Sequence, residues 1–149
     1  MTMKTRLSDD MKQAMRNRDV LRRDVIRYLR SEVRNQEIRD QKELDDAGVI
    51  QVLSRQAQQR RDSIEVYRDA DRQDLVEKEE SELSVILSYL PQQMTSEEIA
   101  DLVQQVVAEV GASGPADMGK VMGAIMPQVR GKAEGREVNA IVQQTLRSL

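Results

Sequence analysis

Four arginines near the N-terminus have the spacing that most clearly suggests chemistry. Arg23, Arg27, Arg30 and Arg34 are separated by four, three and four residues. On a helix these positions fall within an arc of about 60°. Guanidinium groups form paired hydrogen bonds with phosphate oxygens, and a one-sided row of them can follow a nucleic-acid backbone. The spacing therefore predicts that these four arginines contact RNA phosphates.

The charge around this arginine stripe leaves a second interpretation open. Residues 4–39 contain eleven Lys and Arg against six Asp and Glu, which favours an anionic partner. The alternative is a solvated face, or ion pairs with the acidic stretch "EKEESE" at 77–82. Arg22 falls among the apolar positions of the same predicted helix, so we expect it to pair with a carboxylate or to extend its head group to water.

A second basic group lies in "GKVMGAIMPQVRGKAEG", residues 119–135. From 119 to 136 there are four cations and one acid, Glu134. Glycines beside cations allow close approach to a phosphate. The predicted RNA-binding residues of this stretch are Lys120, Arg130, Gly131, Lys132 and Arg136. For Gly119 and Gly123 the stretch also predicts close helix packing, which is compatible with RNA binding.

The residue types that are missing limit both catalysis and RNA recognition. The chain has no Cys and no His, so it offers no thiolate nucleophile, no imidazole base and none of the commonest zinc ligands. No lysine stands in a Ser-x-x-Lys spacing, and Gly119-Lys120 lacks the spacing of a phosphate-binding loop. We therefore expect no catalytic residue, no metal and no cofactor, and identify no small-molecule substrate. Without Phe or Trp to stack on bases, an RNA partner would be structured and bound through its backbone and shape.

The core can only be built from Leu, Val, Ile, Met and Ala, a composition that suits the packing of helices on helices. Helices must therefore position these side chains. The apolar spacing predicts an all-α fold of seven helices in two domains, residues 1–92 and 93–149. The first domain is a four-helix unit with long helices, and the second holds three shorter ones. Expected helices cover about 3–15, 20–39, 46–67, 72–90, 96–110, 118–126 and 136–149.

Helix ends are indicated by capping residues. We expect Asp19, Asp45 or Asp46, Asp71 and Asp117 as N-caps. Thr95 and Glu98 have the spacing of a capping box, and Gly111 is a left-handed stop. Two prolines are expected to end helices, Pro91 after Leu90 and Pro127 near Met126, where the helix would end or shift.

Methionines recur every fourth residue at Met118, Met122 and Met126. A methionine stripe of this kind favours a position in the helical core. The alternative is an adaptable groove for a partner protein, which would make the chain a protein-interaction adaptor.

Signals for targeting are weak. No apolar run reaches the roughly 20 residues of a membrane span. The N-terminal stretch "MTMKTRLSDDMKQAM" has acidic residues and lacks the apolar segment of a secretory signal. We expect a cytoplasmic, bacterial protein with no membrane partner.

Several segments carry a resemblance across nearly the whole chain. They are, in order, "LSDDMKQAM", "LSRQAQQRRDSIEVY", "DLVEKEESEL", "YLP", "DMGKVMGAIMPQVRGKAEG" and "VNAIV". The sequence resembles the YqeY family, which is related to the C-terminal tail of the B subunit of the glutamine-dependent aspartyl/glutamyl-tRNA amidotransferase. The resemblance implies a multihelical N-terminal unit followed by a small helical YqeY-type domain.

The resemblance also implies a function. The amidotransferase tail contacts structured tRNA, and residues 119–133 are the part of this chain most similar to it. The positions that fit its pattern are Gly119, Gly123, Met126, Gly131, Lys132, Ala133 and Asn139, whereas Lys120, Pro127 and Gly135 depart from it. The resemblance thus implies a non-catalytic tRNA-interaction module linked to tRNA amidation, a carbon–nitrogen ligase reaction with glutamine as amide donor. Its expected partners are tRNA and an amidotransferase or an aminoacyl-tRNA synthetase.

Overall fold

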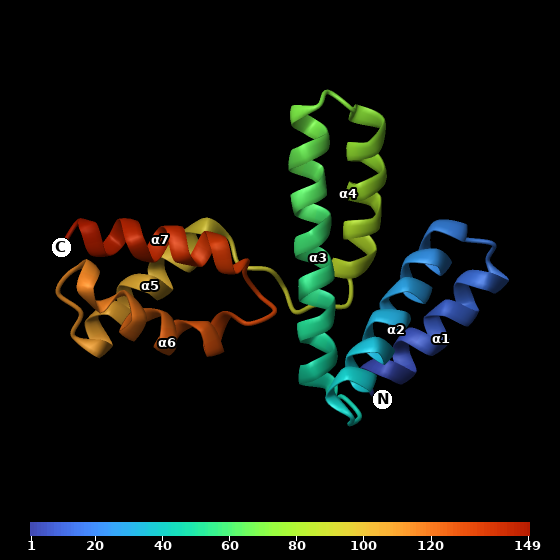
Figure 1. The fold of residues 1–149 in the computed structure, drawn as a ribbon, viewed down its shortest axis with the longest axis horizontal. Coiled ribbons are helices and arrows are strands. Elements are labelled where there is room, and N and C mark those ends of the chain that lie inside the picture. The colour runs from blue at the N-terminus through green and yellow to red at the C-terminus, as the bar shows by residue number, and fades with distance from the viewer. The chain divides into compact units, whose positions relative to one another are not determined.

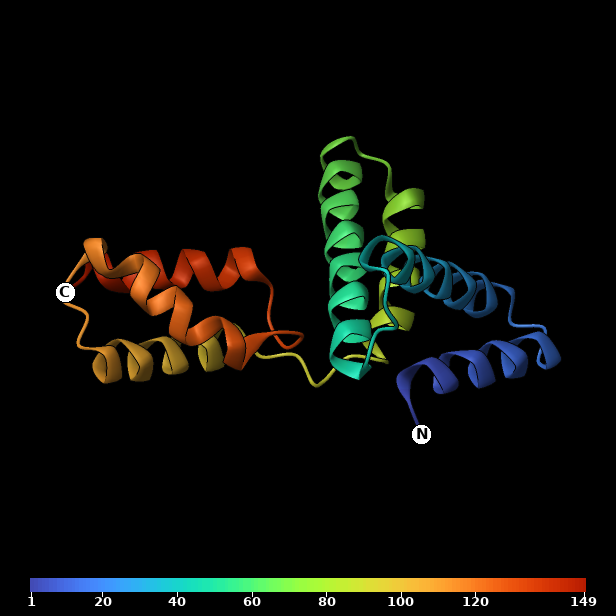
Figure 2. The same cartoon turned by 60° about the horizontal axis from the view of Figure 1, so that its bottom comes forward.

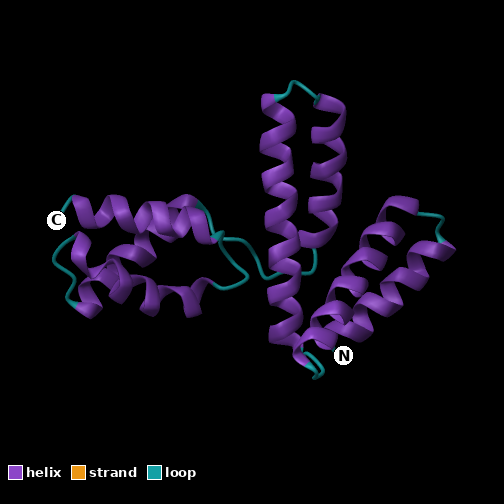
Figure 3. Ribbon diagram, viewed as in Figure 1, coloured by secondary structure: helices purple, strands orange, loops and turns teal.

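The structure, a computed structural model, describes residues 1–149 and contains helices and loops but no strand (Figures 1 and 3). The all-α prediction is confirmed. Its α-helices are α1 (Met3–Arg16), α2 (Val20–Asp40), α3 (Asp46–Asp69), α4 (Gln73–Leu87), α5 (Ser96–Val110), α6 (Met118–Val129) and α7 (Gly135–Arg147), with a short 3-10 helix η1 (Pro115–Asp117) before α6. The chain forms two compact units, Met1–Leu90 (unit 1) and Pro91–Leu149 (unit 2). None of the helices has the length and apolar character needed to cross a membrane.

Unit 1 consists of two helical hairpins, α1–α2 and α3–α4 (Figure 1). Apolar residues three and four apart along α2 face inward, which is the pattern of a helix with one buried side. The buried core of the unit is Leu7, Val25, Ile26, Leu29, Val33, Val49, Val52, Leu53, Ala57, Val85, Ile86 and Tyr89. Every member except Tyr89 is aliphatic, as the composition requires.

Unit 2 is a three-helix unit of α5, α6 and α7 (Figure 2). Its core contains only residues of this unit: Ile99, Val103, Val106, Val107, Val121, Ile125, Val129, Val138, Val142 and Leu146. Met118, Met122 and Met126 are partly buried and pack against this core. The interpretation of the methionine stripe as core is therefore confirmed.

Most predicted helix ends have the expected capping contacts. The Asp19 and Asp45 carboxylates accept hydrogen bonds from the N–H groups of residues three further on. Thr95 and Glu98 form the complete capping box at the start of α5. Gly111 ends that helix with a φ of 68°, a left-handed conformation that glycine adopts without steric cost.

The ends of α4 differ from the prediction. Asp71 does not cap the helix; it lies in the α3–α4 turn with a φ of 57°, and Arg72 precedes the first helical residue without a side-chain cap. The tight reversal needs a left-handed residue, and Asp tolerates that conformation better than most side chains. The helix ends at Leu87 instead of Leu90, because the N–H groups of Tyr89 and Leu90 bond to carbonyls only three residues back.

Two expectations for α6 are also wrong. Pro127 does not end the helix, which continues to Val129, because the N–H of Arg130 bonds to the carbonyl of Met126 at 3.1 Å and Val129 is fully buried in the core. Asp117 stands at the N-cap position but makes no cap bond. Its carboxylate instead accepts the N–H and hydroxyl of Ser113, and the backbone bond from Ser113 is the main reason that the pKa of Asp117 is lowered.

Candidate nucleic-acid interface

The backbone of the turn between α6 and α7 is held by hydrogen bonds on both sides. The Gly131 carbonyl accepts a bond from the side-chain amide of Gln93 at 2.8 Å, and the Lys132 carbonyl accepts one from the N–H of Met94 at 2.8 Å. On the other side, the N–H of Lys132 donates to the carbonyl of Val129 at 2.8 Å. Gly131 has a φ of 79°, which favours glycine at this position. This clamped turn presents the exposed side chains of Arg130 and Lys132.

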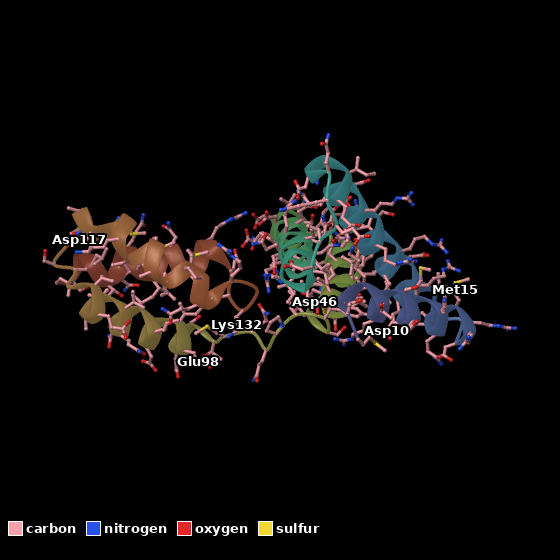
Figure 4. The ribbon with its side chains drawn as sticks, turned by 90° about the horizontal axis from the view of Figure 1, so that it is seen from below. Asp10, Met15, Asp46, Glu98, Asp117 and Lys132 are labelled. Carbon is pink, nitrogen blue, oxygen red and sulfur yellow. The ribbon has the colours of Figure 1, made fainter.

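The other predicted cations of unit 2 do not all join this turn. Lys120 is ten residues before Arg130, at the opposite end of α6, and a helix of that length separates them by about 15 Å. Figure 4 shows Asp117, which lies next to the start of α6, at the far end of the unit from Lys132. Arg136 lies in the first turn of α7 and is exposed.

Gly119 and Gly123 do not serve close helix packing, so that prediction is wrong. Both are exposed, and a Cβ added to either would meet no atom within 4 Å. The reason is the orientation of α6, which buries Val121 and Ile125 and turns the glycine side toward solvent. The exposed face of α6 therefore has no side chain at these two positions. Lys120 lies near the start of this helix, and Arg130 directly follows its end.

Three of the four stripe arginines lie together in unit 1. Arg27, Arg30 and Arg34 line a groove of about 490 Å³ between α1 and α2, and Lys4 of α1 lines it as well. Lys4 was not a predicted site residue, because only the fold places α1 beside the arginine side of α2. Arg23 does not line the groove; its guanidinium pairs with Asp24 at 2.9 Å.

The acidic residues of α4 pair with α3 and not with the arginine stripe. Nε of Arg60 lies 3.2 Å from Glu82 and 3.6 Å from Glu79, and Arg68 lies 3.4 Å from Glu80. Burial and the nearby Glu82 raise the pKa of Glu79. The alternative in which α4 neutralises the stripe is therefore wrong. Arg22 behaves as predicted, since its guanidinium lies 3.9 Å from a carboxylate oxygen of Asp10.

The chemistry available at both surfaces is the binding of anions. Each surface gathers ammonium or guanidinium groups on an exposed part of the fold, and neither contains a group of three or more His, Cys, Asp or Glu that could hold a metal ion. Phosphate oxygens are the natural partners of such groups, with Arg able to form two parallel hydrogen bonds.

Comparison with known proteins assigns the chain to a family. The sequence model described as Yqey-like protein matches residues 4–146. The chain belongs to the YqeY family. Several curated fungal relatives support the assignment, all with the name "Altered inheritance of mitochondria protein 41, mitochondrial".

Three of these YqeY relatives show the extent of the similarity. The Lachancea thermotolerans protein is 42% identical over 113 residues, which are 74% of this chain and 60% of the relative. The Pyrenophora tritici-repentis protein is 31% identical over 134 residues, 89% of this chain and 74% of the relative. The Kluyveromyces lactis protein is 35% identical over 114 residues, 74% of this chain and 61% of the relative. The aligned part thus spans less than two thirds of two of these relatives.

The names of the YqeY relatives contradict the expectation of a cytoplasmic, bacterial protein. The relatives are fungal and are named as mitochondrial. The expectation rested only on not finding a secretory signal or an apolar run long enough to span a membrane. The lack of these features does not distinguish one aqueous compartment from another, which is why the inference failed.

Proposed function

We propose that this YqeY-family chain is a non-catalytic RNA-interaction module and that its partner is a structured RNA, tRNA. The observation that carries the proposal is the clamped turn, which fixes Arg130 and Lys132 next to the end of α6. Two cations on a backbone turn that is already held in place lose less conformational entropy on binding than two cations on a mobile loop.

The glycine face of α6 supports the same proposal. Gly119 and Gly123 leave open space above the helix, so a sugar–phosphate backbone can come close to it. Lys120 is available near the start of the helix and Arg130 follows its end. Phosphate contacts of this kind can supply a large share of the affinity for a nucleic acid and do not require aromatic stacking. The net charge of −3 means that the attraction must be local.

The choice of tRNA, and the link to glutamine-dependent amidation, rest on the resemblance of unit 2 to the amidotransferase tail. In this proposal the chain holds tRNA for an enzyme that carries out the chemistry, an amidotransferase or an aminoacyl-tRNA synthetase. The protein-adaptor alternative has less support, because Met118, Met122 and Met126 pack against their own core.

A tRNA titration at two salt concentrations tests the proposal. We expect binding at low salt and an affinity about tenfold or more lower when the salt is raised from about 50 to about 200 mM, because bound phosphates release counterions. Lys132→Glu should weaken binding further at low salt. Lys78→Glu, the same change at an exposed position of α4, should leave the affinity unchanged. Absence of binding by the unaltered chain at low salt would refute the proposal.

A further inference from the structure

The groove between α1 and α2 is crossed by a contact between the two helices, that of Lys4 with Glu37. It is lined by one side of each helix, with Leu7 and Val33 deep in the unit and three arginines above them. The Lys4 ammonium contacts the Glu37 carboxylate, which also accepts the N–H of Leu44 at 2.8 Å. These hydrogen bonds, with that of Lys4 the stronger influence, lower the pKa of Glu37.

The groove keeps a net positive charge when the ion pair between Lys4 and Glu37 is subtracted. Glu37 is the only acidic residue among its lining residues, and Lys4 already pairs with it. The guanidinium groups of Arg27 and Arg34 make no hydrogen bond or ion pair with the protein, and the only hydrogen-bond partner of Arg30 is the sulfur of Met11, at 3.5 Å. Three guanidinium groups on one wall are therefore available to a ligand.

The burial of the groove floor decides which class of ligand it can take. Leu7 is 1% exposed and Val33 is 4% exposed, so covering them removes almost no further apolar surface from water. An amphipathic helix or an acyl chain would gain little there. A ligand must be held by charge, and guanidinium groups match phosphate oxygens best. Arg27 and Arg34 are seven residues apart, about 10 Å along the helix, a spacing that suits two or more adjacent phosphate groups better than one.

We infer that this groove is a phosphate-binding site that takes two or more adjacent phosphate groups of one ligand, as in a polyphosphate or a phosphodiester chain. Arg27, Arg30 and Arg34 bind the phosphates, and the Lys4–Glu37 pair holds α1 to α2 beside them. The site lies in unit 1 and shares no residue with the tRNA surface of unit 2, so it does not rest on the proposed function.

The test uses the full chain and two probes, inorganic triphosphate and a hexanucleotide RNA without a terminal phosphate, titrated by calorimetry at low salt. The double variant Arg27→Ala/Arg34→Ala should bind about tenfold more weakly or worse than the unaltered chain. The matched control Arg16→Ala/Lys42→Ala removes two exposed cations outside the groove and should bind as before. Circular dichroism should show the same helix content in all three proteins.

The two probes separate the possible sources of the phosphates. Triphosphate binding that the groove variant loses supports a polyphosphate ligand, and binding of the RNA alone, lost in the same variant, supports a phosphodiester ligand. NMR of the unaltered chain gives a readout that needs no variant, since amide signals of residues 27–34 should shift when the probe is added. The inference is overturned if neither probe binds, if the variant and the control bind equally, or if only signals outside the groove shift.

Discussion

The hydroxyl of Tyr89 donates a hydrogen bond of 2.6 Å to the carboxylate of Asp10, a residue 79 positions earlier in the chain. Asp10 also lies 3.8 Å from Arg6 and 3.9 Å from Arg22, and the Arg6 guanidinium lies 4.6 Å from the centre of the Tyr89 ring. Tyr89 is 3% exposed. This cluster ties α1 and α2 to the turn that follows α4 and so stabilises the hairpin that carries the groove.

We expect Tyr89→Phe to lower the free energy of unfolding of unit 1 by about 1–2 kcal/mol, because the Asp10 carboxylate loses a hydrogen-bond donor while the ring contacts remain. Urea unfolding followed by circular dichroism measures the change. Tyr28→Phe is the matched control, since Tyr28 is 42% exposed and its hydroxyl has no partner; it should change stability by less than about 0.5 kcal/mol. Equal effects of the two variants would show that the Asp10 bond contributes nothing.

Tyr89 also predicts a loss of stability in alkali. Burial, and then the hydrogen bond to Asp10, raise the pKa of Tyr89 above its ordinary value of about 10. In the unfolded chain the hydroxyl ionises near that value while the folded chain keeps its proton, so the free energy of unfolding should fall as the pH rises above about 10. Unfolding measured between about pH 9 and 11 should show this decline, and Tyr89→Phe should reduce its slope. An unchanged slope in the variant would assign the decline to other groups.

Glu37 should contribute to stability in two separable ways. Glu37→Gln keeps an acceptor for the N–H of Leu44 and removes the ion pair with Lys4, whereas Glu37→Ala removes both. We expect Ala to cost about 1 kcal/mol more than Gln, the usual contribution of one hydrogen bond. Thermal unfolding of the two variants measures the difference. If the Gln variant is as unstable as the Ala variant, the contribution of Glu37 comes from the ion pair and not from the bond to the N–H of Leu44.

Gly123→Ala should raise stability and lower tRNA affinity at once. The position is helical, exposed and open, so Ala should stabilise α6 by about 0.5–1 kcal/mol. Under the proposed function, the added methyl keeps the RNA backbone away from the helix and weakens binding. Thermal unfolding and the tRNA titration give the two values. A more stable variant with unchanged affinity would remove the glycine face from the proposed interface.

Gly131→Ala is the contrasting substitution. Its φ of 79° is disfavoured for Ala, which should cost about 1 kcal/mol or more and disturb the bonds to Gln93 and Met94. We therefore expect loss of stability together with loss of tRNA binding, measured by the same two experiments. A variant of full stability would mean that the clamped turn does not need a left-handed residue.

Local features of the fold could be predicted from the sequence because their causes are local. The caps at Asp19, Asp45 and Thr95 depend on residues within one turn of the chain, and the left-handed Gly111 depends on its own lack of a side chain. The wrong expectations for Asp71 and Pro127 have tertiary causes. The α3–α4 reversal determines the conformation of Asp71, and the packing of Val129 extends α6 beyond Pro127.

The candidate sites show the same limit. The spacing of Arg27, Arg30 and Arg34 places them on one side of a helix, but only the packing of α1 adds Lys4 and removes Arg23. Spacing likewise cannot tell which side of α6 faces its neighbours, so Gly119 and Gly123 were assigned to packing although they face solvent. The spacing gives the angles between residues around a helix axis, whereas the tertiary packing determines which of these residues face the core.

The core of unit 2 is made only from residues of unit 2. A gene segment that encodes residues 91–149 should therefore behave as a portable cassette, able to fold when it is fused behind an unrelated protein.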